Sequence, residues 1–168
     1  MWGGIYAVLF SISTLLSYEN PLKNGFTKST ADSYTKYTWS NVEFQNKIVG
    51  KEVQYSFYED KKFGPLQRGQ SISITDQGGI WTGYGFVRKI KLKEMLHLNF
   101  DFFPGIYLKN GEEDLGGWLM FRSGIELEYI VNTDWSISLG YDHRSSGDIW
   151  EYNPGMETIK LSVSKFKI

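Results

Sequence analysis

The chain has no cysteine among its 168 residues, which excludes a disulfide framework and a thiolate metal site. It also lacks an excess of basic residues. A net charge of −1 and a pI near 6.1 remove the electrostatic basis for binding nucleic acid. Long apolar runs are missing too, because the best candidate, Ile5–Leu16, is interrupted by Ser11, Ser13 and Thr14 and falls short of the roughly 18 apolar residues of a spanning helix. The sequence therefore argues against a helical membrane protein.

The composition that remains, 41% hydrophobic with 17% aromatic and 22% charged residues, is typical of one folded domain. The N-terminal segment differs from the rest. Ile5–Leu16 has the character of the apolar part of an export signal, yet no basic residue precedes it and the first one is Lys23. We expect residues 1–32 to be an export-signal remnant or an N-terminal extension, as strand or helix, and residues 33–168 to form a single domain.

Short alternating runs separated by turn residues fill the chain from about residue 33 onward, which predicts an all-β meander. In one run, Leu96, Leu98 and Phe100 share a face opposite His97 and Asn99. Eight runs of this kind are enough to close a small barrel. The predicted strands are 34–45, 51–59, 65–75, 80–89, 94–103, 118–130, 134–143 and 156–166.

Alternation alone leaves two barrels open, because a soluble lipocalin-like barrel turns its apolar row inward and an outer-membrane barrel turns it toward lipid. The polar rows carry charges such as Arg122, Glu126 and Glu128 that can pair inside a lumen, and aromatic residues gather near strand ends as interfacial girdles do. The sequence therefore favours an eight-stranded antiparallel up-and-down transmembrane β-barrel. The soluble ligand-binding barrel is the alternative.

An even number of strands puts both termini on the periplasmic side, so the connection between the last two strands lies at the outer surface. The other long link at that end is 104–117, and 131–134 forms a tight turn at the opposite end. The acidic run 112–114 in the long link is expected to be a solvated loop.

A base, a hydroxyl and a carboxylate share one face of the last two predicted strands. His143 and Ser145 are two residues apart and therefore emerge on the same side. Antiparallel pairing places Glu157 beside His143, where a carboxylate can fix the imidazole tautomer. The turn between the strands offers backbone N–H groups and the Asn153 amide to an oxyanion. This is the equipment of a serine hydrolase, although Asn153-Pro154-Gly155 by itself also predicts an ordinary turn in a barrel without activity.

The order His-x-Ser followed by Asn-Pro-Gly-x-Glu resembles the lipid A 3-O-deacylase (PagL-type) family, which is related to acyloxyacyl hydrolases. Three upstream segments, 103–107, 114–116 and 121–126, also resemble segments of that family. The similarity extends from about residue 63 to the end of the chain. It implies an eight-stranded barrel in the bacterial outer membrane, with a Ser-His-Glu site on the lipid-facing side near the outer surface. The roles it implies are Ser145 as nucleophile, His143 as general base and then acid, Glu157 as orienting carboxylate, and Asn153, Gly147 and Asp148 as oxyanion or substrate-positioning groups.

The resemblance further implies an esterase that removes the 3-O-acyl chain of lipid A in lipopolysaccharide and needs no cofactor or metal. Its expected partners are that substrate and the surrounding outer-membrane lipid, without nucleic acid, and a homodimer is compatible with this interpretation. One position departs from the family, because Ser146 stands where an Asn usually follows the nucleophile. A small outer-membrane barrel with a structural or adhesive role is the alternative function.

Overall fold

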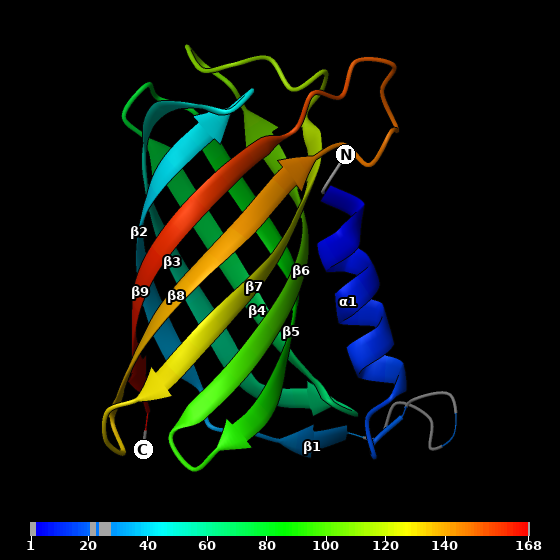
Figure 1. The fold of residues 1–168 in the computed structure, drawn as a ribbon, viewed down its shortest axis with the longest axis vertical. Coiled ribbons are helices and arrows are strands. Elements are labelled where there is room, and N and C mark those ends of the chain that lie inside the picture. The colour runs from blue at the N-terminus through cyan, green and yellow to red at the C-terminus, as the bar shows by residue number, and fades with distance from the viewer. Residues whose placement is uncertain (1–2, 21–22, 24–27, 168) are drawn as a thin grey trace.

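The structure is a computed structural model that describes residues 3–20, 23 and 28–167. Its main feature is a barrel of long antiparallel strands with one helix lying outside it (Figure 1). The elements are α1 (Gly3–Leu15), β1 (Lys28–Thr30), β2 (Tyr34–Phe44), β3 (Lys47–Phe63), β4 (Leu66–Thr75), β5 (Ile80–Lys93), β6 (Leu96–Leu108), β7 (Leu119–Ile130), β8 (Trp135–Ser145) and β9 (Met156–Phe166).

The barrel closes because each strand from β2 to β9 pairs with its neighbours in the chain and β9 pairs back onto β2. The short strand β1 adds to the end of β3, outside this ring of eight. The links 109–118 and 146–155 are long and lie at the end opposite the C-terminus, whereas the turns after β3, β5 and β7 are short (Figure 1). This is the asymmetry of an outer-membrane barrel, with long loops outside and tight turns in the periplasm.

All eight strands that the alternation predicted are present, and the structure lengthens four of them, including β8, which continues past 143 to Ser145. β3 begins at Lys47 because Gln45 and Asn46 take positive φ values of 50° and 64° and reverse the chain in a tight turn. β5 continues to Lys93. β6 continues through Pro104 to Leu108, so the outer link starts at 109 and not at 104 as predicted.

Charged side chains fill the lumen and pair there. Arg122 on β7 donates to Asp142 on β8 and to Glu52 on β3, so a single guanidinium joins three strands across the barrel. Buried charges are tolerated only when they are paired and hydrogen-bonded, and this network satisfies that condition. Its ion pairs are Lys36–Glu126, Arg122–Glu52, Arg122–Asp142, Arg144–Glu52, Lys160–Asp101, Lys160–Glu126, Lys160–Asp142 and Lys89–Glu128.

The apolar rows face outward, which contradicts the soluble alternative. On β8, for example, Ile137 and Leu139 are exposed while Ser136 and Ser138 are buried. A water-soluble barrel would bury these aliphatic side chains inside, whereas here they form the surface that lipid covers. Other exposed apolar side chains are Trp39, Val53, Tyr55, Ile72, Ile74, Ile106, Leu127, Tyr129, Ile159 and Leu161.

The helix α1 lies against the outward face of the barrel and contacts β5, β6, β7 and β8 (Figure 1). Within the N-terminal segment 1–32, residues 3–15 are thus helical and residues 28–30 form β1, and its assignment as an export-signal remnant or an extension stays a prediction. Within the part of the chain that the structure describes, no helix is long and apolar enough to cross a membrane.

Candidate active site

The pairing of β8 with β9 places His143 directly opposite Glu157. The imidazole Nδ1 lies 2.9 Å from Glu157 Oε1, which is a good hydrogen-bond distance. The His143 side chain is nearly covered, and that of Glu157 is 22% exposed. A carboxylate at Nδ1 holds the proton on that nitrogen and leaves Nε2 as the acceptor that a general base needs.

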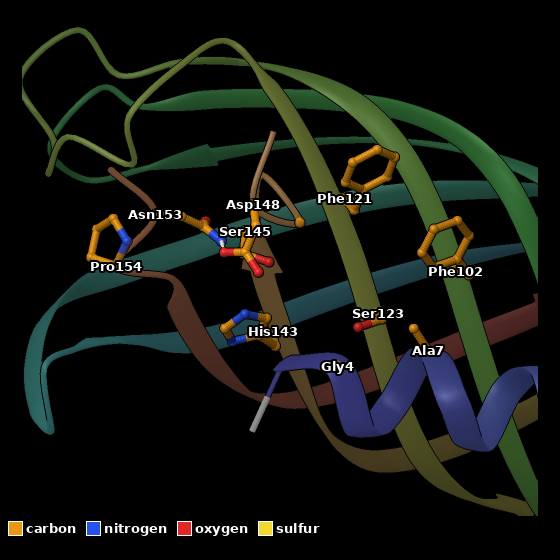
Figure 2. A pocket seen from close by; sticks show the side chains of 11 residues that line it. Gly4, Ala7, Phe102, Phe121, Ser123, His143, Ser145, Asp148, Asn153 and Pro154 are labelled. Carbon is orange, nitrogen blue, oxygen red and sulfur yellow. Dashed lines mark hydrogen bonds between the residues drawn. The ribbon is translucent and has the colours of Figure 1, made fainter. Parts of the chain in front are cut away.

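Ser145 follows on the same face of β8, and its side chain lies on the same side of the strand as the His143 ring (Figure 2). Both residues line one outward-opening pocket of about 550 Å³. Activation of a hydroxyl requires a base that can come within hydrogen-bond reach, and the shared face and pocket put His143 and Ser145 on the same side of the strand for this. The pocket is lined by Gly4, Ala7, Phe102, Phe121, Ser123, His143, Ser145, Gly147, Asp148, Asn153 and Pro154.

A tight turn begins directly after Ser145. Ile149 N–H donates to Ser146 O at 3.3 Å, and the two residues between them, Gly147 and Asp148, have φ values of 62° and 61°. Positive φ at both central positions defines a type I′ turn. The backbone N–H groups of Gly147 and Asp148 take no part in that closing hydrogen bond, and both residues line the pocket. They are therefore candidate backbone donors to a group bound in the pocket, whereas the N–H of Ser146 donates to Asn153 Oδ1.

The Asn153 amide braces the same turn. Its Oδ1 accepts from Ser146 N–H at 2.9 Å, and its Nδ2 donates to Asp148 Oδ1 at 2.9 Å. Asn153 also lines the pocket. The Ser146 side chain points away from the pocket, is fully buried, and its Oγ has no hydrogen-bond partner among the described residues. The departure from the family at position 146 thus leaves the turn closed by Asn153.

Gly155 lets the second half of the loop pass closely over the imidazole. Its φ is +72°, and a Cβ built there would lie 2.5 Å from His143 Cε1. Only glycine combines this backbone conformation with this approach. The Asn-Pro-Gly sequence is therefore more than a turn signal, since it packs the loop onto the base.

The lumen network fixes the strand behind the site. Asp142 and Arg144 flank His143 on β8 and point inward, where Asp142 binds Arg122 at 2.9 Å and Arg144 binds Glu52. Buried ion pairs on both sides of His143 hold its backbone on the outer wall. Within residues 3–20, 23 and 28–167, no group of three His, Cys, Asp or Glu side chains is arranged to hold a metal ion.

Five pocket residues were not predicted from the sequence. Ser123 pairs directly with His143 across β7 and β8, and its signal was a lone hydroxyl in the apolar row of β7. Phe102 and Phe121 looked like ordinary lipid-facing aromatics, and Gly4 and Ala7 belong to the helix, whose position no local pattern predicts. The expectation of a solvated run at 112–114 was wrong for Glu112, which is 8% exposed because it accepts from Tyr107 OH at 2.8 Å.

Comparison with solved structures confirms the fold. The crystal structure of the outer-membrane enzyme PagL matches with a TM-score of 0.58 and 12% identity, over 78% of this chain and 97% of that one. Neisserial surface protein A (NspA) matches with a TM-score of 0.55 and 10% identity, over 83% and 98%. A de novo designed transmembrane β-barrel matches with a TM-score of 0.62 and 9% identity, over 83% and 98%. At these identities the matches show the barrel and nothing finer.

Sequence comparison identifies the family. A search of curated proteins found no match. The family model described as lipid A 3-O-deacylase (PagL) matches residues 16–166, which include the whole barrel and the pocket residues of β6, β7, β8 and the link that follows β8. The chain therefore belongs to the lipid A 3-O-deacylase (PagL) family, ester hydrolases of the bacterial outer membrane.

Proposed function

We propose that this chain hydrolyses the 3-O-acyl ester of lipid A with Ser145 as nucleophile, His143 as general base and Glu157 as the carboxylate that orients it. The observation that carries the proposal is the 2.9 Å contact between His143 Nδ1 and Glu157 Oε1 beside Ser145, on the outward face of the barrel. Charged and polar groups are rare on a lipid-facing surface, and those that occur there usually serve a function.

The reaction begins when Ser145 Oγ attacks the ester carbonyl carbon and transfers its proton to His143 Nε2. The carbonyl oxygen becomes an oxyanion, for which the N–H groups of Gly147 and Asp148 and the Asn153 amide serve as donors in this proposal. The carbon–oxygen ester bond then breaks, and His143 returns the proton to the departing 3-hydroxyl of lipid A. Water, deprotonated by His143, releases the fatty acid from the acyl-serine and restores the hydroxyl.

The position of the pocket selects the kind of substrate. A site that opens on the outward wall near the long loops is reached from the outer leaflet by a lipid whose ester lies close to the headgroup boundary. Lipopolysaccharide is the lipid of that leaflet, and the 3-O-acyl ester of its lipid A lies at that depth. The family to which the chain belongs acts on this ester.

Mass spectrometry of lipid A incubated with the detergent-refolded protein tests the proposal. We expect the wild type to remove one 3-hydroxyacyl mass and Ser145→Ala to remove none. Ser146→Ala is the matched control, because it deletes a neighbouring hydroxyl that points away from the pocket and has no partner among the described residues. Unchanged lipid A from folded wild-type protein would favour the alternative, a barrel with a structural or adhesive role. Activity that survives Ser145→Ala would exclude Ser145 as nucleophile.

A further inference from the structure

The helix α1 forms part of the pocket that holds His143 and Ser145 of the candidate triad. Gly4 and Ala7 line this pocket from the helix side, opposite Phe102, Phe121 and the β8 residues (Figure 2). One turn further along, the Phe10 ring packs on Phe102 with ring centroids 6.0 Å apart. Residues 4, 7 and 10 share a helix face because they are three apart. On this face the side chains beside the pocket, at Gly4 and Ala7, are small, and the next one, Phe10, is bulky.

The other faces of α1 suit a lipid environment. Ile5, Val8, Leu9 and Ile12 are exposed, as they are on a helix whose outer side meets acyl chains. The hydroxyls of its polar residues return to carbonyls of the same helix: Ser11 to Ala7 O at 2.9 Å, Ser13 to Phe10 O at 2.9 Å and Thr14 to Phe10 O at 2.8 Å. Internal satisfaction of polar groups is what a bilayer demands of a helix.

The pocket runs from a polar end to an apolar end. His143, Ser145 and Asn153 lie at the polar end under the loop. The apolar end has a floor formed by Phe102 and Phe121, whose rings stack with centroids 5.8 Å apart and planes 13° apart. An ester whose carbonyl is at Ser145 would place its acyl chain along these rings and beneath Gly4 and Ala7.

We propose that α1 is one wall of the acyl-chain site and that Phe10 closes its far end, so that this helix determines which acyl-chain length is hydrolysed. The inference rests on the proposed function and adds a specificity-determining element to it. The acyl chain of the substrate is already surrounded by hydrocarbon in the bilayer, so its entry into the groove brings little hydrophobic gain. The groove therefore discriminates by shape, and a chain that collides with Phe10 holds its ester away from Ser145.

The test compares two lipid A preparations that differ only in the length of the 3-O-acyl chain. The two are mixed, incubated with the full-length protein, and their products are measured by mass spectrometry. We expect Phe10→Ala to shift the kcat/KM ratio toward the longer chain by about tenfold, the scale on which a shaped apolar pocket discriminates by a methylene or more. Ala7→Leu should lower kcat/KM for both chains by about tenfold because it fills the groove. Val8→Ala is the control on the lipid-facing side of the same helix and should leave the ratio unchanged.

The outcomes separate this proposal from the function on which it rests. Folding of every variant is checked by heat-modifiable gel mobility, and Phe10→Leu replaces Phe10→Ala if the latter does not fold. Active variants with the wild-type ratio would overturn the role of α1 and leave the deacylase intact, whereas a folded but inactive wild type would overturn the function itself. Protein purified from outer membranes should retain the helix, and a mature chain that begins after Leu15 would also overturn the proposal.

Discussion

Removal of the Arg122 guanidinium should destabilise the barrel more than loss of any surface charge. In the wild type this group donates to Asp142 and Glu52 with N···O distances of 2.9 and 2.7 Å, and it also reaches Ser73 and Thr158 at 3.2 Å. All of these partners are buried in the lumen. The substitution Arg122→Leu keeps much of the side-chain volume and removes every one of these hydrogen bonds.

The expected magnitude follows from what the two carboxylates retain. Asp142 keeps Lys160 at 3.2 Å and Glu52 keeps Arg144, so neither is left wholly uncompensated. Breaking a buried ion pair costs about 3–5 kcal/mol, and the surviving partners place Arg122→Leu near the lower limit, at about 3 kcal/mol. Lys109→Ala is the surface control. Its pair with Asp114 is more than half exposed on both sides, so its loss should cost less than about 1 kcal/mol.

Urea unfolding of the refolded barrel in detergent micelles, followed by gel mobility, measures both changes. Activity gives a second readout, because Asp142 precedes His143 and its displacement should lower the hydrolysis rate of folded Arg122→Leu. Arg122→Lys should recover part of the stability, since an ammonium cannot bind two carboxylates in the planar geometry of a guanidinium. If the free energy of unfolding of Arg122→Leu lies within about 1 kcal/mol of the wild-type value, the lumen network does not stabilise the strand behind the site, and the reasoning is refuted.

Three further predictions concern the loop end of the barrel. Glu157→Gln should lower kcat by about 10²–10⁴-fold with little change in unfolding, because the amide no longer fixes the His143 tautomer; steady-state kinetics beside urea titration would reveal any contrary result. Gly155→Ala should lower the free energy of unfolding by about 1–3 kcal/mol and remove most of the activity, because the added methyl group would collide with the His143 imidazole and the backbone there is left-handed; an active, stable variant would rule this out. Burial raises the pKa of Glu112 above 4.5, so the folded state holds that proton more tightly and stability should fall as pH rises above 4.5. Glu112→Gln keeps the contact with Tyr107 and should reduce this loss, and identical pH profiles for the two proteins would contradict the assignment.

Much of the site could be predicted from strand parity. Side chains alternate with period two, so the apolar neighbours of His143 on β8 and of Glu157 on β9 were enough to put both on the same face. The remaining uncertainty was the register, because a slip by one residue would send the carboxylate into the lumen. In the structure, the link from Ser146 to Gly155 closes with His143 paired with Glu157.

The pocket walls could not be predicted in the same way. Gly4 and Ala7 reach the site through the packing of α1 against β5 to β8, which lie far from it in the sequence, and no local period encodes such a contact. The continuation of β6 through Pro104 was hidden for a different reason, because proline usually interrupts a strand. The ladder with β7 nevertheless runs through Pro104 to Ile106, and the pairing with β5, which is interrupted at Phe103 and Pro104, resumes from Gly105 to Leu108.

The outward opening of the pocket also decides how the enzyme must be assayed. Its substrate arrives by lateral diffusion within a leaflet, so the quantity that sets the rate is the mole fraction of lipid A around the barrel and not its concentration per litre. Inert detergent added at constant lipid A should slow hydrolysis as it dilutes the surface, and extra buffer that leaves the micelles unchanged should not. Kinetic constants for this protein therefore have meaning only in surface units.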